Sequence, residues 1–348
     1  MCRHIAAYKE EGDSRVNIIA AVPDSAYPAV IDDESRKKLE SLGNVVYRPD
    51  LCSGSSETDY ADALRDAEAH ILVTGWGSPK LTAKVYAENP QLEYMCHLAG
   101  TVRAYIDPDI IDRGLLVSNW GTVIARSVAE GALCMMLGCL RKITFYQMEL
   151  HIRKGWRGDR PSEGLFEQRV GLHGLGAIAQ ELVTLLKPFG CRVSAYSPHC
   201  PDSVFSRLDV RRADSLEELF SENRVISVHA SKTDANFHVI NKHILSLLED
   251  GGVLVNTARG AVIDTEALTA ELRTGRIEAA LDVFEEEPLA EDSPLRGLEN
   301  CMLMPHMGGP TPDRQVDMGR LGVKNIENYI QGNEVVYRVT RERFDLIT

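Results

Sequence analysis

The chain has 348 residues, which is enough for about two domains of about 150 residues, each with a core of its own. Hydrophobic residues make up 44% of the sequence and charged residues 26%, the proportions of an ordinary globular protein. The 38 Lys and Arg residues against 51 Asp and Glu residues give a formal net charge of −13. No basic cluster interrupts this acidic balance, so a nucleic-acid partner is not expected.

The sequence predicts neither a membrane segment nor a targeting signal. The longest run of apolar and small residues, 131–140, is far below the roughly 18 residues that cross a bilayer. The N-terminal residues lack a continuous apolar run followed by a cleavage site. The eight cysteines are scattered without a CxxC pair, which favours reduced thiols and argues against a structural metal. We therefore expect a cytoplasmic protein with no membrane partner and no metal site.

Short runs rich in Val, Ile and Leu alternate with longer amphipathic segments in the first third of the chain. This alternation is typical of βα units and parallel sheets. The predicted strands are Val16–Val22, Val45–Arg48, Ile71–Thr74, Leu92–Cys96 and Leu115–Ser118. Helical patterns at Asp33–Leu42 and Tyr60–Ala67 lie between them. Five βα units make one compact open sheet.

A second series of apolar runs predicts a second doubly wound domain. Its six predicted strands are Val170–His173, Arg192–Tyr196, Val225–His229, Val253–Asn256, Ala279–Val283 and Met302–Met304. The fold class is therefore α/β, with two doubly wound parallel-sheet domains.

Two further helices are predicted outside these series. Ser127–Ile143 is apolar almost all round, so it must be buried, either between the domains or against a second copy of the chain. Near the C-terminus, Thr311 offers an N-cap and Pro312 suits a first helical position, with an amphipathic pattern to about Gln331. This last helix is expected to pack on the first domain.

The clearest local motif is a glycine turn between a predicted strand and a predicted helix. Gly174, Gly176 and Ala179 have the G-x-G-x-x-[GA] spacing of dinucleotide-binding turns. The first glycine allows the tight turn and the second lets the backbone approach a pyrophosphate. The small third residue allows close packing of a helix whose N-terminus attracts phosphate. This context favours nucleotide binding over a simple packing turn.

The end of the next predicted strand bears on the choice of dinucleotide. The position where an acidic residue would hold the adenosine ribose is Ser197. No carboxylate there would repel a 2′-phosphate, so both NAD and NADP are admissible. The basic residues downstream either assist a 2′-phosphate or form a solvated face; they are His199, Arg207, Arg211 and Arg212.

Three residues whose side chains can bind or exchange protons with a substrate follow successive predicted strands. Arg259 follows Val253–Asn256, Glu287 follows Ala279–Val283, and His306 follows Met302–Met304. The carboxyl ends of parallel strands meet at one edge of a sheet, where ligands of such folds bind. An arginine holds a carboxylate bidentately, and a histidine exchanges a proton with a carbonyl oxygen. Each residue alone could be a surface or structural residue, but their convergence favours catalysis.

With these motifs in order, the sequence resembles the D-isomer-specific 2-hydroxyacid dehydrogenases over nearly its whole length. The matching pieces are residues 98–102, residues 127–130, the glycine turn, residues 256–260, residues 282–288 and residues 305–306. The resemblance implies a Rossmann cofactor domain at 124–307. It also implies a flavodoxin-like substrate domain made of 1–123 and 308–348. Catalysis would take place in the cleft between them.

The resemblance also implies roles for particular residues. Arg259 would clamp the 2-oxo acid, His306 would donate the proton to its carbonyl oxygen, and Glu287 would orient His306 and favour its protonated form. Backbone amides of the substrate-binding residues Ala99, Gly100, Thr101 and Val102 would hold the carboxylate, beside Arg259. The expected cofactor-binding residues are Gly174, Leu175, Gly176, Ala177, Ile178, Ser197, Thr257, Ala258 and Asp282. A homodimer through the cofactor domain is implied as well.

Two other functions stay open at this stage. One is a dehydrogenase of another small anion, such as formate or phosphite. Formate-specific relatives pair the histidine with Gln, so Glu287 argues against that substrate. The other is a dinucleotide-sensing binding protein, like the corepressors that share this fold and similar site residues.

Overall fold

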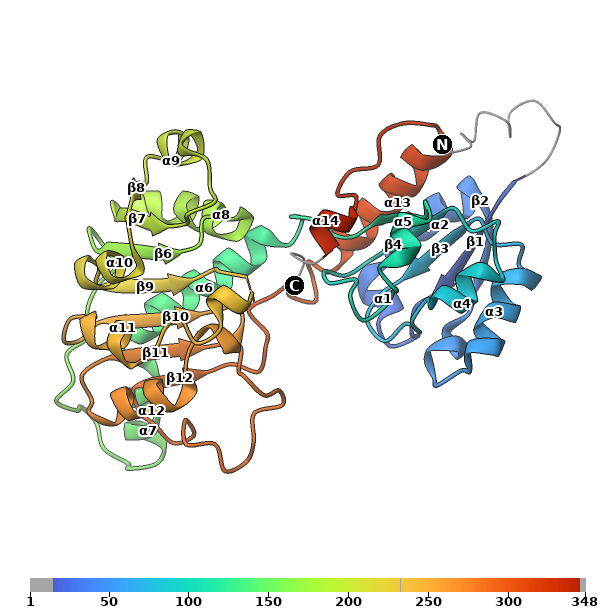
Figure 1. The fold of residues 1–348 in the computed structure, drawn as a ribbon. Helices are drawn as coiled ribbons and strands as arrows, with labels where there is room; N and C mark the ends of the chain where they lie inside the picture. The colour runs from blue at the N-terminus through green and yellow to red at the C-terminus, as the bar shows by residue number, and fades with distance from the viewer. Residues whose placement is uncertain (1–14, 232, 345–348) are drawn as a thin grey trace. The chain divides into compact units, whose positions relative to one another are not determined.

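The computed structural model describes residues 15–231 and 233–344 of the chain. Within them the chain forms two compact units, drawn in Figure 1. The first unit runs up to Ile124 and resumes at Pro312, and the second spans Ala125–Thr311.

The first unit is built on a parallel sheet of five strands, as predicted. Their order is β2-β1-β3-β4-β5, which is the flavodoxin-like order. The strands are β1 (Val16–Ala21), β2 (Gly43–Tyr47), β3 (Ile71–Thr74), β4 (Tyr94–His97) and β5 (Leu116–Ser118). The predicted bounds agree with these to within about two residues.

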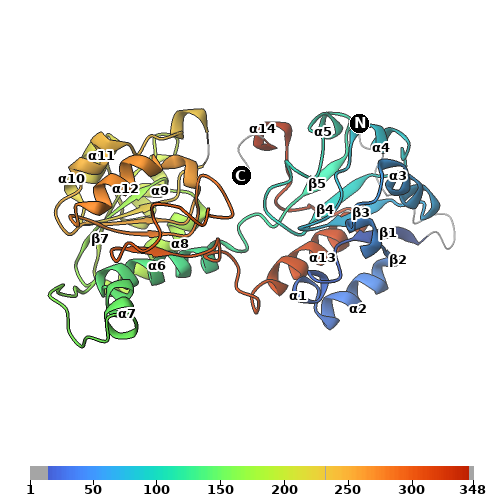
Figure 2. The same cartoon turned by 90° about the horizontal axis from the view of Figure 1, so that it is seen from below.

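Helices cover both faces of this sheet (Figure 2). One face carries α3 (Glu57–Asp66), α4 (Ala83–Ala87) and α5 (Asp109–Asp112); the other carries α1 (Tyr27–Val30), α2 (Asp33–Leu42) and α13 (Val316–Ile330). A short helix, α14 (Arg341–Phe344), follows. Alternation along the strands divides the core, because Ile18 packs on the α2 side and Ile19 on the α3 side.

The C-terminal helix α13 packs on the first unit as expected, but it begins later than predicted. Residues 312–315 form turns, and the regular helix starts at Val316. Gly319 and Gly322 explain the close packing, since a Cβ on Gly319 would lie 1.9 Å from the carbonyl oxygen of Val30. Arg320 also pairs with Asp32, the residue that caps α2.

The second unit holds a parallel sheet of seven strands rather than the predicted six. Its order, β12-β11-β10-β9-β6-β7-β8, is the Rossmann order with one strand added. The strands are β6 (Arg169–His173), β7 (Arg192–Tyr196), β8 (Arg211–Arg212), β9 (Val225–Val228), β10 (Val253–Asn256), β11 (Glu278–Leu281) and β12 (Cys301–Leu303). The unpredicted strand is β8, whose two arginines carry no apolar signal. The chain reverses its strand order at β6, which places the switch point between β6 and β9.

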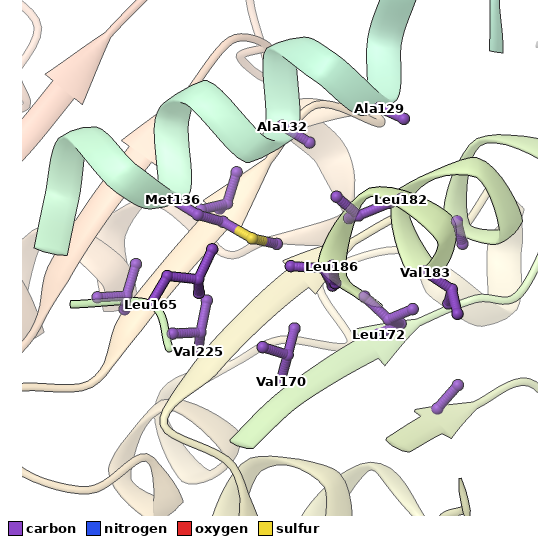
Figure 3. Packing of buried hydrophobic residues seen from close by; sticks show 14 of the residues in the cluster. Ala129, Ala132, Met136, Leu165, Val170, Leu172, Leu182, Val183, Leu186 and Val225 are labelled. Carbon is purple, nitrogen blue, oxygen red and sulfur yellow. The ribbon is translucent and has the colours of Figure 1, made fainter. Parts of the chain in front are cut away.

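Two layers of helices enclose this sheet. One layer holds α6 (Ala125–Leu140), α8 (Ala177–Leu186) and α9 (Asp202–Leu208); the other holds α10 (Leu216–Glu222), α11 (Lys242–Leu247) and α12 (Thr265–Arg273). Short 3₁₀ turns and α7 (Ile143–His151) complete the unit. Figure 3 shows the core between α6, α8 and the sheet, with Met136 pointing toward Leu182 and Leu186.

The sequence did not predict which surface buries the apolar helix α6. Helix α6 packs on α8 and on the sheet of its own unit, through residues such as Ala129 and Ala132. The helix begins at Ala125, before the predicted Ser127, and ends at Leu140 rather than at the predicted Ile143. It ends early because Lys142 adopts a left-handed conformation with φ of 56° and separates α6 from α7.

Two buried histidines make the stability of the fold sensitive to acid. His97 is 1% exposed and His173 4% exposed, and burial lowers their pKa values to about 3 and about 4. Between the ordinary histidine pKa near 6.5 and these values, the unfolded chain binds protons that the folded chain does not. Folding stability therefore falls as pH falls through this window, by about 1.4 kcal/mol per pH unit for each histidine.

Urea unfolding of the native protein and of His173→Gln between pH 7 and pH 4.5 measures this contribution. The variant has no titrating group at this position. Its free energy of unfolding should therefore fall less steeply on acidification, by about 1.4 kcal/mol per pH unit, than that of the native protein. Parallel stability curves would contradict the prediction.

Candidate active site

The carboxyl edge of the seven-stranded sheet begins with the predicted glycine turn. Gly174 has a φ of 98° and donates its N–H to the carbonyl of Tyr196 at 2.9 Å. A Cβ there would lie 2.9 Å from the carbonyl carbon of His229. A left-handed backbone against a neighbouring strand therefore requires glycine. Leu175 is buried below the turn, and the fully buried Ala179 lets α8 pack closely on the core.

The turn presents the N-terminus of α8 with space in front of it. Gly176 is the N-cap, no side chain caps the helix, and nothing lies within 4 Å of where a Cβ would stand. Ala177 and the half-buried Ile178 form the first turn. Uncapped N–H groups at a helix N-terminus attract phosphate. Nearby on the same edge, the Oγ1 atom of Thr257 is buried without a hydrogen-bond partner. These residues fit a bound dinucleotide.

The two glycines of the turn give a matched pair of variants. Gly176→Val should fold normally, because its backbone is extended and the space is open, yet the new side chain would block the approach of a pyrophosphate. We expect dinucleotide affinity to fall by about tenfold or more, since about 1.4 kcal/mol of lost contacts suffices. Gly174→Val should instead lose stability, because its backbone has a positive φ.

Titration calorimetry with NADH and NADPH, alongside thermal unfolding, separates these two effects. An unchanged dinucleotide affinity in Gly176→Val would contradict the role of the turn.

The loop after β7 is held in place by Arg212. Arg212 donates to the carbonyls of Ser197 at 3.2 Å and Cys200 at 2.7 Å, and pairs with Asp202 at 2.7 Å. Its guanidinium also lies 3.9 Å from the centre of the Phe205 ring. The other basic residues differ: Arg207 bonds Gln180, Arg211 pairs with Glu218 and Glu222, and His199 is exposed.

Arg259 lies directly after β10, where the side chain of Asn256 fixes the backbone. The amide of Asn256 donates to the carbonyl of Arg259 at 3.0 Å and accepts from the N–H of Ala258 at 3.0 Å. Gly260 packs on the backbone of Phe284, so no side chain fits at that position. Burial lowers the pKa of Arg259, while the negative charge of Glu287 acts in the opposite direction. The predicted arginine is therefore half-buried and electrostatically coupled to the predicted glutamate.

Glu287 and His306 form a direct pair. Glu287 Oε2 lies 2.7 Å from His306 Nδ1, and Glu287 Oε1 accepts the N–H of Phe284 at 3.0 Å. Burial alone would raise the pKa of Glu287. The hydrogen bonds from His306 and Phe284 and the positive charges of His306 and Arg259 outweigh burial, so the pKa is lowered overall. The carboxylate thus holds one ring nitrogen of His306, and no described residue bonds the other.

Asp282 holds the backbone around His306 in place. Its two carboxylate oxygens accept the N–H groups of Met307 at 2.7 Å and Gly308 at 2.9 Å, and its carbonyl accepts the N–H of His306 at 2.9 Å. These contacts secure a left-handed backbone at His306, with φ of 54°. Burial raises the pKa of Asp282, and the two N–H donors lower it in part. The sequence placed Asp282 among the cofactor residues and gave no sign of this bracing.

The predicted substrate loop lies at the carboxyl edge of the other sheet, after β4. Ala99, Gly100 and Val102 are buried and Thr101 is half-buried. Asn119 donates to the carbonyl of Gly100 at 2.6 Å. Among residues 15–231 and 233–344, no acceptor takes the N–H of Gly100, Thr101 or Val102.

Three further structural features of these sites were not predicted. They are the bracing of Arg259 by Asn256, the pair between His238 and Glu285 at 2.7 Å, and the loop bracing by Arg212. An Asn at a strand end was a usable signal, whereas the other two depend on residues far apart in sequence. In the described part of the chain, no helix is long and apolar enough to span a bilayer and no cluster of three potential ligands could hold a metal ion.

A glycine turn at a Rossmann switch point, with Arg, Glu and His at the ends of three further strands, defines the chain as a dinucleotide-binding α/β protein. Residues 133–308 match the family model described as D-isomer specific 2-hydroxyacid dehydrogenase, NAD binding domain. The chain belongs to the D-isomer-specific 2-hydroxyacid dehydrogenase family, and the predicted resemblance is confirmed.

Individual relatives support this assignment. A D-3-phosphoglycerate dehydrogenase from Methanocaldococcus jannaschii is 30% identical over 306 residues, which are 87% of this chain and 56% of that relative. A hydroxypyruvate reductase from Thermotoga maritima is 34% identical over 269 residues, or 75% and 83% of the two chains. The chain thus spans about half of the first relative and most of the second.

Similarity in structure extends over both units. The NAD complexed form of a D-isomer specific 2-hydroxyacid dehydrogenase from Lactobacillus delbrueckii ssp. bulgaricus has a TM-score of 0.77 at 19% identity. The match covers 93% of this chain and 99% of that structure, which confirms the predicted fold class.

Proposed function

We propose that the chain transfers a hydride between NAD or NADP and a small 2-oxo acid or D-2-hydroxy acid. The observation that carries this proposal is the 2.7 Å contact between Glu287 and His306 beside the half-buried Arg259. All three lie at the sheet edge that bears the glycine turn. In this proposal 125–311 is the cofactor unit, and the residues up to 124 with those from 312 are the substrate unit.

The residues divide the reaction between them. A bound nicotinamide would supply the hydride that the carbonyl carbon accepts. Arg259 binds the carboxylate and stabilises the negative charge that develops on the carbonyl oxygen. His306, held at Nδ1 by Glu287, gives a proton to that oxygen from Nε2. In the reverse direction the same nitrogen takes the proton from the hydroxyl group.

The substrate carboxylate has a second set of donors in the loop Ala99–Val102. The unpaired N–H groups of Gly100, Thr101 and Val102 are suited to an anion. Since buried backbone donors are rarely left without an acceptor, a bound carboxylate accounts for them.

The cofactor is a nicotinamide dinucleotide, and the remaining residues support a place for each part of it. When the cofactor binds, the turn from Gly174 to Ile178 would hold its pyrophosphate, and Ser197 would hold its adenosine ribose. Thr257, with its unpaired hydroxyl, and Ala258 and Asp282 line the path beyond. Because Ser197 carries no charge, NADP is accepted as well as NAD. We also propose that the protein is cytoplasmic and forms a homodimer through the cofactor unit.

A spectrophotometric screen tests the proposal. Purified protein is incubated with NADH or NADPH and glyoxylate, hydroxypyruvate, pyruvate or phenylpyruvate, and oxidation of the cofactor is followed. Turnover that Arg259→Ala abolishes would support the proposal. Tight dinucleotide binding without turnover on any 2-oxo acid would contradict it.

A further inference from the structure

Two tryptophans meet above the loop that follows β4. Trp76 follows β3 and Trp120 follows β5, the two strands on either side of β4 in the sheet. Their ring centroids are 5.4 Å apart and their planes cross at 77°. Because all these strands are parallel, the three loops gather at one edge.

The indole of Trp120 lies directly on the backbone of this loop. A Cβ on Gly100 would stand 2.5 Å from Cζ2 of Trp120, so only glycine allows the contact. The N–H of Trp120 donates to the carbonyl of Ala99 at 3.2 Å, and Asn119 donates to that of Gly100 at 2.6 Å. The loop carbonyls are therefore already paired, whereas the N–H groups of residues 100–102 meet no acceptor in the described part of the chain.

Hydrogen bonds and ring packing within the first unit hold the loop of Trp76 and the β4 loop together. Thr74, at the end of β3, and His97, at the end of β4, share a 2.9 Å hydrogen bond between Oγ1 and Nδ1. The His97 ring packs on Tyr105 with centroids 4.6 Å apart, and the Tyr105 hydroxyl accepts the N–H of Gly77 at 3.4 Å. Both loops are thus set in place by groups of the same unit.

Trp76 remains 39% exposed, so part of its indole is open to a ligand. An exposed indole packed on a half-buried one, beside unpaired N–H donors, is suited to a ligand with a carboxylate at one end and an apolar group at the other. The contacts among these two tryptophans and the loop are made by aromatic rings, backbone groups and the amide of Asn119, and such a lining is suited to an apolar group.

We infer that Trp76 and Trp120 form the subsite for the substrate side chain, and that the protein prefers 2-oxo acids with a bulky aliphatic or aromatic side chain. This inference rests on the proposed function and narrows its substrate class. Glyoxylate, which has no side chain, gains nothing from the indoles, whereas phenylpyruvate buries its ring against them.

The kinetic test compares phenylpyruvate, 4-methyl-2-oxopentanoate and glyoxylate. In the native protein kcat/KM should rise with the size of the apolar side chain. In Trp76→Ala the ratio of kcat/KM for phenylpyruvate to that for glyoxylate should fall by about tenfold or more, and Trp76→Phe should restore much of it. Phe166→Ala removes an aromatic ring that is 67% exposed in the other unit and serves as the matched control. An unchanged ratio in Trp76→Ala would overturn the subsite.

A binding test separates this inference from the proposed function. The chain has three tryptophans, so in Trp156→Phe the fluorescence comes from Trp76 and Trp120 alone. In this variant 3-phenyllactate should quench the fluorescence at a concentration at least about tenfold lower than lactate does. Such quenching without turnover on any 2-oxo acid would contradict the proposed reaction and support the subsite. Equal quenching by both acids would overturn the subsite, even if the enzyme turns over.

Discussion

Replacing Arg259 by Lys is expected to lower kcat/KM for every accepted 2-oxo acid by about 10²–10³-fold, the usual effect of losing one donor to a developing oxyanion. Lysine keeps the positive charge but loses the planar pair of donors that a carboxylate meets bidentately. The side chain of Arg259 is half-buried at a backbone fixed by Asn256, so a lysine there has little freedom to reach another position.

The control for this variant is Arg211→Lys. Arg211 lies in the same unit on the edge strand β8, where it pairs with Glu218 and Glu222 on the protein surface. We expect its steady-state kinetics to match those of the native protein. NADH affinity should be the same in both variants, because neither residue belongs to the glycine turn. If Arg259→Lys kept native kcat/KM, the role of Arg259 in binding the substrate would be wrong.

Most of the fold was predictable because strand and helix signals are local. The apolar runs of buried parallel strands predicted eleven strands to within about two residues, and the bounds of β3, β7 and β10 agree with the structure residue for residue. The edge strand β8 was missed because Arg211 and Arg212 join the sheet through backbone pairing with Ser194 and Ala195. Such a strand depends on its neighbour and leaves no hydrophobic pattern in its own sequence.

The place of a helix was less predictable than its existence. The all-apolar pattern of α6 showed that it is buried, but many surfaces could bury it equally well. Its partner, α8, is more than 30 residues further along the chain, and the contact depends on how both helices cover the sheet. Packing partners of this kind come from tertiary structure, which periodicity does not encode.

The residues of the candidate site were predictable from the sequence, but the contacts between them were not. Arg259, Glu287 and His306 could be found because each follows a strand end, and parallel strands bring those ends to one edge. The contacts that fix them could not. Asp282 holds the N–H groups of Met307 and Gly308, which are more than 20 residues away, and nothing in the sequence around Asp282 distinguishes that use from cofactor binding.

Replacing His306 by Gln is expected to lower kcat for 2-oxo acid reduction by about 10²–10⁴-fold, the usual contribution of a positioned proton donor. Glutamine keeps a polar side chain but has no proton to transfer at neutral pH. The native reduction rate should fall as pH rises, because the donor must carry its proton, and oxidation of the hydroxy acid should rise over the same range. His243→Gln removes an exposed histidine of the same unit and should leave both profiles unchanged.

Glu287→Gln tests the partner in the same profiles. The lowered pKa of Glu287 means that its carboxylate stays ionised to a lower pH than an ordinary glutamate, so its negative charge stays beside the His306 ring throughout the working range. With a neutral amide in its place, the decline of the reduction rate should begin at lower pH, while the hydrogen bond to Nδ1 keeps the ring oriented. Stopped-flow measurement of the hydride-transfer step from pH 5 to pH 9 shows whether the decline moves. A profile that stays in place in Glu287→Gln would mean that Glu287 only orients the ring, and a flat native profile would exclude His306 as the proton donor.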